Sequence, residues 1–327
     1  MKHAKLSTLL IVVIVFSFVG NAFSQVDLLT GFLRGSYYEM GNDIKEVSGK
    51  MISYDTIYMT GWQGNDSISL ERNSSPMVKL LTSKGSQHNF KRLTKSDDCM
   101  VAFMQYDVLI NEQLKDIKKY SKRTDSIFVL LPLGLEEIHC ITLKENKIKN
   151  LNGLKKKRVA IGAEGQGTQV TTRFIKEKTG IEWIDFELSF KDAMPALLNK
   201  QIDAFFFVGS APVMSLNSLS PTFEKLKFIP ITEESLVDYY VPTIVPAGTY
   251  HWLKEDIETF GVKVIMISDI SKESAKDKVY ITKLIREIQS NIGKLQDKGH
   301  PNWKKVDFNF SEIKWEIHPI SESIFGL

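Results

Sequence analysis

The alternation of apolar and polar residues along the chain predicts an α/β protein. Short apolar runs, each closed by glycine or polar residues and followed by a helix-like segment, recur from one end to the other. We interpret residues 26–31, 100–104, 158–161 and 204–208 as strands. Residues 204–208 are almost wholly apolar, which is typical of a parallel sheet covered by helices on both faces.

Other segments extend this pattern. Residues 53–60 and 67–73 predict two strands joined by a turn, and residues 127–133 and 138–143 predict two more. Residues 271–294 predict one long amphipathic helix, because apolar residues recur on one face at Ile281, Leu284, Ile285, Ile288 and Ile292.

The clearest candidate for a binding site is the loop after the strand at residues 158–161. Gly162, Gly165 and Gly167 let the backbone approach a ligand, and Thr168 is expected to cap a helix over residues 169–178. Free N–H groups at a helix start favour a carboxylate or a phosphate. The spacing matches neither a P-loop nor G-x-G-x-x-G, and an ordinary tight turn is the alternative.

Similar polar turns follow other predicted strands. Thr30 and Gly31 close the first strand, and Arg34, Gly35, Ser36 and Tyr37 lead into a helix. Gly85 and Ser86 open another helix, Gln105 and Asp107 follow the strand at residues 100–104, and Gly209 follows residues 204–208. In open α/β sheets, ligands bind at the carboxyl ends of strands. The alternatives are packing for Tyr37, a solvated charge for Arg34 and a helix cap for Asp107.

Residues 1–24 are expected to be an export signal that is cleaved near Ser24. Lys2 and Lys5 precede an apolar run at residues 9–19, and small residues follow it. A retained N-terminal anchor is the alternative. The signal predicts an extracytoplasmic, periplasmic protein that begins near Gln25.

Composition excludes several functions. Without Lys2 and Lys5, the 42 basic residues fall to 40 against 39 acidic ones, a balance that argues against a nucleic-acid partner. The 2 cysteines, Cys99 and Cys140, offer no disulfide framework, although one bond between them stays open. The histidines show no metal-binding spacing, and there is no nucleophile motif. We therefore expect no catalytic residues, no metal, no cofactor and no enzyme activity.

The order of several motifs resembles the TAXI family of solute receptors of TRAP (tripartite ATP-independent periplasmic) transporters. These motifs are I-H-C-I-T-L at residues 138–143, the glycine loop at residues 162–168, D-A-F-F-F-V-G at residues 203–209, P-A-G-T-Y at residues 246–250 and H-P at residues 318–319. The sequence departs from the family pattern at Phe32, Leu33 and Arg34, where glycines are usual, and at Gln166, where serine is usual.

The resemblance implies a periplasmic-binding-protein-like fold of type II, with two α/β lobes, a two-strand hinge and a ligand cleft between the lobes. Residues 25–137 and 265–327 would form lobe I, and residues 138–264 would form lobe II. The expected function is a monomeric receptor that captures a small dicarboxylate or an amino acid, such as glutamate or 2-oxoglutarate, for TRAP permease membrane subunits. A sensor or surface interaction protein without a permease is the alternative.

Together, the glycine turns and the resemblance give one set of expected ligand-binding residues. Arg34 would pair with a ligand carboxylate in a bidentate manner. The set comprises Thr30, Gly31, Arg34, Gly35, Ser36, Tyr37, Gly85, Ser86, Gln105, Gly165, Gln166, Gly167, Thr168 and Gly209.

Overall fold

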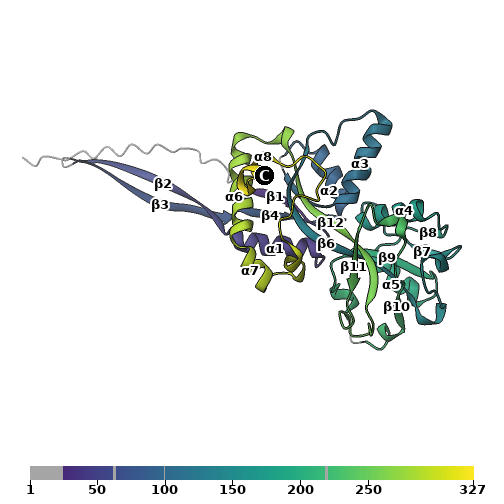
Figure 1. Ribbon diagram of the computed structural model, residues 1–327. Coiled ribbons are helices and arrows are strands. Elements are labelled where there is room, and N and C mark those ends of the chain that lie inside the picture. Colours follow the sequence, from purple (N-terminus) through teal and green to yellow (C-terminus); the bar gives the residue numbers. More distant parts are fainter. Residues whose placement is uncertain (1–24, 62–63, 99, 218–219) are drawn as a thin grey trace, which may run out of the picture.

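One sheet of ten strands runs through the whole molecule (Figure 1). The computed structural model describes residues 25–61, 64–98, 100–217 and 220–327, and of residues 51–73 it describes the backbone alone. The main path of the sheet has the order β4-β1-β5-β12-β6-β9-β7-β8, and β10 and β11 pair with β6 and β12. The expected export signal at residues 1–24 lies outside the described residues.

The first lobe is built on three parallel strands, β1 (Val26–Leu29), β4 (Val78–Leu81) and β5 (Met100–Gln105). Helices from both ends of the chain cover this part of the sheet. They are α1 (Ser36–Ser48), α2 (Ser86–Lys95), α3 (Tyr106–Lys119), α6 (Ala275–Ser290), α7 (Ile292–Lys298) and α8 (Pro319–Phe325).

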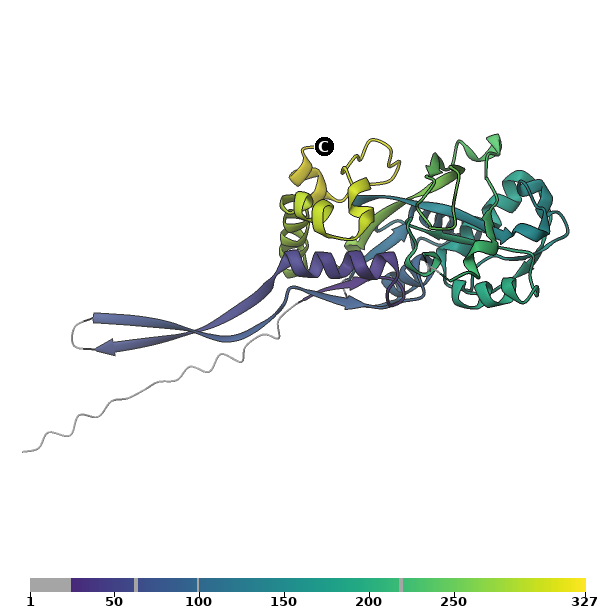
Figure 2. The ribbon, with the colours of Figure 1, turned by 90° about the horizontal axis from the view of Figure 1, so that it is seen from below.

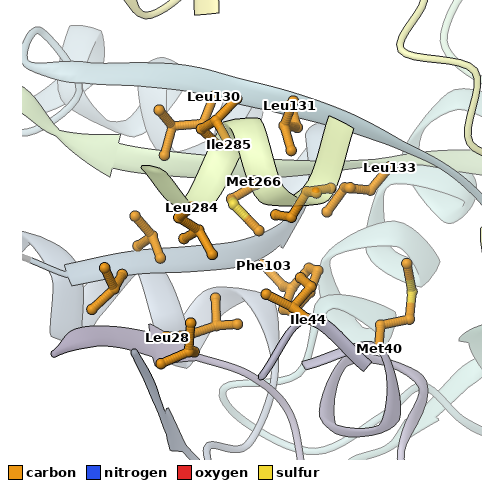
Figure 3. Packing of buried hydrophobic residues seen from close by; sticks show 14 of the residues in the cluster. Leu28, Met40, Ile44, Phe103, Leu130, Leu131, Leu133, Met266, Leu284 and Ile285 are labelled. Carbon is orange, nitrogen blue, oxygen red and sulfur yellow. The ribbon is translucent and has the colours of Figure 1, made fainter. Parts of the chain in front are cut away.

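The core of the first lobe joins residues that are far apart in the sequence. Leu28, Ile44 and Phe103 pack in one cluster with Leu284 and Ile285 of α6, and all of them are buried (Figure 3). This burial explains the apolar face of α6, because its residues point into the sheet.

The second lobe contains a group of three short parallel strands, two further strands that pair in the antiparallel direction, and two helices. Its strands are β7 (Arg158–Ala160), β8 (Ile184–Phe186), β9 (Ala204–Gly209), β10 (Leu226–Phe228) and β11 (Val241–Val245), and its helices are α4 (Gly167–Thr179) and α5 (Phe190–Leu198). All residues of β9 are buried. The prediction of a strand buried on both faces is therefore confirmed.

Two long antiparallel strands, β6 (Ile127–Leu143) and β12 (Ile257–Asp269), pass from one lobe to the other. At one end β12 pairs with β5, and at the other end β6 pairs with β9. The predicted architecture, two α/β lobes joined by two strands, is confirmed. The prediction of separate strands at residues 127–133 and 138–143 is wrong, because β6 continues through Pro132 and Gly134 with an irregular register.

A long antiparallel ribbon extends from the first lobe. Its strands are β2 (Lys50–Gly61) and β3 (Gly64–Pro76), which form a separate two-stranded sheet. Figures 1 and 2 show this ribbon projecting away from both lobes. The prediction of two strands here is confirmed, although both are longer than expected.

The segment expected as one helix over residues 271–294 is divided. A 3-10 turn over Ile270–Lys272 precedes α6, which begins after Ser274, and Asn291 ends α6 before α7 starts. The Ser274 side chain accepts a hydrogen bond from the Asp277 backbone N–H, and the Asp277 carboxylate accepts one from the Ser274 N–H. This capping box fixes the start of α6, so the prediction of one continuous helix is wrong.

Candidate functional site

The turns expected to bind ligand meet where the two lobes touch. The Gly165 carbonyl oxygen accepts a hydrogen bond of 3.0 Å from the His88 backbone N–H, and the Gly165 N–H donates one of 3.2 Å to Gln87 Oε1. Gly85 has a positive φ of 125°, and a Cβ there would lie 3.6 Å from the Gln166 Cα. The start of α2 therefore lies directly against the start of α4.

Gln105 and Gly167 occupy adjoining space between the lobes. A Cβ on Gly167 would lie 1.7 Å from Gln105 Oε1, so only glycine fits here without movement of Gln105. Gln105 is 3% exposed, and its Oε1 atom has no hydrogen-bond partner among the described residues. A buried acceptor without a donor is unfavourable, and a bound molecule or water could supply that donor.

Four polar side chains, Tyr37, Ser86, Gln105 and Glu136, form a buried group that we call the cleft network. Glu136 Oε2 accepts a 2.8 Å hydrogen bond from Gln105 Nε2 and a 3.3 Å hydrogen bond from the Tyr37 hydroxyl. The Ser86 hydroxyl oxygen accepts the Gln105 backbone N–H at 3.0 Å. These contacts join α1, α2, β5 and β6.

Burial changes the acidity of Glu136. Removal from water raises the pKa of its carboxyl to about 7, and the nearby charge of Glu137 acts in the same direction. The hydrogen bonds from Gln105 and Tyr37 oppose this rise. Near neutral pH, Glu136 is therefore present in both its protonated and its ionised form.

A second group of polar contacts joins the lobes through Asp107. Its Oδ2 atom accepts hydrogen bonds from the Thr171 hydroxyl at 2.7 Å and the Tyr240 hydroxyl at 3.0 Å. Burial raises the pKa of Asp107 to about 6, although these two hydrogen bonds partly offset the rise. Because Asp107 belongs to α3 and its partners belong to the second lobe, these contacts stabilise the closed arrangement.

The helices that start at this place have no side-chain caps. Gly35, Gly85 and Gln166 are the N-cap residues of α1, α2 and α4, and none of them makes a side-chain capping hydrogen bond. By contrast, Ser189 and Ser274 cap α5 and α6, which start elsewhere. Uncapped helix starts leave backbone donors and the positive end of the helix dipole directed toward the region between the lobes.

Several expected site residues serve the fold around this region. The Thr30 hydroxyl donates to the Leu81 carbonyl oxygen at 3.1 Å, next to the buried Gly31. Thr168 lies inside the first turn of α4, and its hydroxyl oxygen accepts the Val208 N–H at 3.1 Å. The expectation that Thr168 caps the helix is therefore wrong, because Gln166 occupies the N-cap. Gly209 ends β9 and pairs with Glu137 of β6.

The first loop places its distinctive side chains in solvent. Phe32 is 46% exposed and Leu33 is 64% exposed, while the backbone of Arg34 adopts a positive φ of 64°. Arg34 is exposed and has no ion-pair partner within the described part of the chain. Gly35 and Ser36 continue from this loop into α1 and so bring Tyr37 into the cleft network.

Sequence reasoning missed three residues of this site. Glu136 stands in a long apolar strand, and Thr171 and Tyr240 contact Asp107 from distant segments of the chain. The pair of acids Glu136 and Glu137 between apolar runs is a signal that the sequence does carry, because an unpaired charge is rarely buried. No comparable signal marks Thr171 or Tyr240.

Two surface hollows lie away from the cleft network. One of about 470 Å³ lies beside α2 and β4, and another of about 540 Å³ lies beside β10 and β12. Within the described ranges, no three His, Cys, Asp or Glu residues are grouped as metal ligands, and no helix has the length and apolar character to cross a membrane. Cys140 is a buried free cysteine, and Cys99 lies outside the described residues.

Comparison with known families identifies the chain. Residues 28–308 match the profile of the NMT1-like family. This range includes both lobes and the cleft network. The chain belongs to the NMT1-like family. A comparison of this NMT1-like protein with curated proteins gives no match.

Solved structures with a similar fold include binding proteins of several kinds. MatC from Rhodopseudomonas palustris with bound malate is 12% identical, with a TM-score of 0.48 over 82% of this chain and 84% of its own. The amino acid ABC transporter substrate-binding protein AbpA from Streptococcus pneumoniae, bound to L-arginine, is 13% identical, with a TM-score of 0.43 over 86% and 94%. The CcmR regulatory domain of Synechocystis PCC6803 with 2-PG is 9% identical, with a TM-score of 0.44 over 80% and 96%. Malate, L-arginine and 2-PG are ligands of these similar proteins.

Proposed function

We propose that this NMT1-like protein is an extracytoplasmic receptor that captures a small carboxylate between its lobes and delivers it to a TRAP-type permease. The ligand class is a dicarboxylate or an amino acid, such as glutamate or 2-oxoglutarate. The receptor is a periplasmic monomer of the TAXI type, exported by residues 1–24, and acts without catalysis.

One observation carries this proposal: uncapped starts of helices from both lobes converge on a buried polar network. The starts of α1 and α2 in the first lobe and of α4 in the second lobe offer backbone N–H donors that suit a carboxylate. When protonated, Glu136 adds a hydrogen-bond donor to the same place. Direct contact between Gly165 and α2 corresponds to a closed receptor.

The proposed lobe boundaries follow the crossing strands. Lobe I comprises residues 25–137 and 265–327, lobe II comprises residues 138–264, and β6 and β12 bend to open the cleft. Opening would separate Asp107 from Thr171 and Tyr240, and Gly165 from His88 and Gln87. A ligand that enters would then replace the direct contact between Gln105 and Gly167.

Calorimetric titration with glutamate, 2-oxoglutarate, malate and a neutral amide as control tests the proposal. We expect at least one carboxylate to bind and the amide not to bind. Gln105→Ala should weaken binding by about 10-fold or more, because a charge-assisted or buried hydrogen bond contributes roughly 1.5–3 kcal/mol. Arg34→Ala measures the contribution of the first loop. No binding of any carboxylate by the native protein would favour the interaction-protein alternative.

A further inference from the structure

The C-terminal half of α3 exposes apolar side chains in a row. Leu114, Ile117 and Tyr120 recur every third residue and are 48%, 66% and 97% exposed. Figure 1 shows α3 at the upper edge of the first lobe, on the side next to α4 of the second lobe. Single exposed apolar residues are ordinary, but three at a spacing of three residues at one helix end are a group of a kind that usually contacts something.

Tyr120 has an unusual backbone for an aromatic residue. It is the C-cap of α3 and has φ 51° and ψ 38°, which is the left-handed region. Glycine or asparagine adopts this conformation more easily than a residue with a large side chain. Helix stability alone therefore does not explain a tyrosine that is almost completely exposed at this position.

The charges of this segment are divided between its buried and exposed sides. The two acids, Glu112 and Asp116, are 4% and 3% exposed, and both form ion pairs with Arg123. Ser121 and Thr124 also donate hydrogen bonds to Asp116. The acids of this half of α3 are thus neutralised beneath the surface.

The exposed charges around the apolar row are mainly positive. Lys118, Lys119 and Lys122 are exposed and have no ion-pair partner among the residues that the structure describes. Lys115 forms an ion pair with Glu112 at 2.6 Å. Asp125 is an exposed acid that lies close to these lysines in the sequence. The surface therefore combines a protruding apolar row with a net positive charge.

We propose that Leu114, Ile117, Tyr120, Lys118, Lys119 and Lys122 form a docking surface for the anionic phospholipids of a membrane, which we call the α3 surface. The lysines attract the headgroups, and the three apolar side chains enter the interfacial region, where tyrosine is favoured. A protruding row suits a deformable lipid surface, whereas an acidic protein partner would need a matching groove. The α3 surface would hold the protein at the membrane and is separate from the cleft network.

Vesicle co-sedimentation tests this proposal with the chain from Gln25 onward, because the apolar residues 9–19 would themselves bind lipid. We expect binding to vesicles of phosphatidylcholine with 30% phosphatidylglycerol, weak binding to phosphatidylcholine alone, and loss of binding in 0.5 M salt. The triple variant K118Q/K119Q/K122Q should bind at least about 10-fold more weakly, since each lysine near an anionic surface contributes roughly fivefold.

A matched variant separates the α3 surface from net charge. K155Q/K156Q/K157Q removes three exposed lysines from the second lobe and should bind as the native protein does. The proposal would be overturned if the native protein did not bind anionic vesicles. It would also be overturned if both triple variants lost vesicle binding to the same extent. The first of these results would leave an acidic protein as the fitting partner for the α3 surface.

Tyr120→Gly separates docking from folding. Glycine relieves the left-handed backbone, so this variant should melt at the native temperature or above it while binding vesicles about 10-fold more weakly. Val279→Ser, which removes a 65% exposed apolar side chain from α6, is the control and should leave binding unchanged. If Tyr120→Gly bound vesicles as strongly as the native protein does, this result would also contradict the proposal. No solute is present, so the result is independent of carboxylate capture.

Discussion

Glu136 is an acid buried at the junction of the lobes, and its ionisation should affect both stability and ligand binding. Its pKa rises from 4.5 to about 7 on folding, so the folded protein holds this proton more tightly than the unfolded chain does. The stabilising effect is complete below the unfolded pKa and is lost as the pH rises through about 7.

We therefore expect Glu136→Gln to reduce the loss of stability between pH 5 and pH 8 by up to about 3 kcal/mol. Urea unfolding at the two pH values measures the difference. Glu177→Gln, at an exposed position on α4, is the control and should behave as the native protein does. Asp107 contributes a pH dependence of the same sign to all three proteins, because its pKa is also raised. Equal pH dependence in Glu136→Gln and native protein would show that Glu136 is solvated.

Gly167 and Gln105 should be coupled energetically, because they occupy adjoining space. The Cβ of Gly167→Ala would lie 1.7 Å from Gln105 Oε1, so this variant should lose about 1–3 kcal/mol of stability in the closed form. Truncation of Gln105 to alanine removes the clash. The double variant Gln105→Ala/Gly167→Ala should therefore lose less stability than the sum of the losses in the two single variants.

Thermal unfolding of the four proteins measures this coupling. Gly293→Ala on α7 is the control, because a Cβ there meets no atom within 4 Å, and alanine favours a helix. Strictly additive effects at Gly167 and Gln105 would indicate that the lobes are apart in solution.

At the scale of single elements, the caps of the helices distinguish folding from binding. The Ser274 capping box is remote from the cleft network and should act only on stability. Ser274→Ala is expected to reduce the free energy of unfolding by about 1 kcal/mol without altering carboxylate affinity. Chemical denaturation and titration of the same protein check the two parts. Thr282→Ala, at a partly exposed position within α6, is the control and should change stability little, because the hydrogen bond lost to the Lys278 carbonyl oxygen is offset by the higher helix propensity of alanine.

The repeating strands and glycine turns could be predicted from the sequence because local signals determine them. The apolar β9 carries such a signal, and so do the turns at Gly85 and Gly165, where a positive φ favours glycine. The need for glycine at Gly167 comes instead from its contact with Gln105. The edge strand β4 was missed because only Val78 of its four residues is fully buried, which leaves a weaker apolar pattern than that of the equally short β1. Strand β6 was divided in the prediction because Pro132 and Gly134 usually end a strand.

The cleft network could be predicted only in part, because its contacts depend on tertiary structure. Tyr37, Ser86 and Gln105 follow turns that the sequence marks, and the structure brings them together. Glu136 was missed because it joins them from the middle of the crossing strand β6. The split between α6 and α7 was also missed, since the apolar face continues across Asn291 in the sequence.

At the scale of the whole molecule, the contacts between the lobes predict a change of shape with ligand. Asp107 and Gly165 make hydrogen bonds across the cleft that must break for solute to enter. In small-angle scattering, we expect a mixture of open and closed molecules without ligand and a smaller radius of gyration with saturating carboxylate. Asp107→Leu, which cannot accept the bonds from Thr171 and Tyr240, should shift the protein without ligand toward the larger radius. An unchanged radius in both experiments would contradict closure by these contacts.

The mixed origin of the first-lobe core has a consequence for the order in which the protein can fold during synthesis. Leu28 and Ile44 are made early, but their partners Leu284 and Trp303 leave the ribosome nearly last. The second lobe can complete its core from one continuous segment, whereas the beginning of the chain must wait for the end. A chain that stops before α6 should therefore keep a protease-resistant second lobe and lose residues 26–120 rapidly, whereas the complete chain protects both. In the export that we propose, this delay would keep the leading part of the chain extended until translocation is nearly complete.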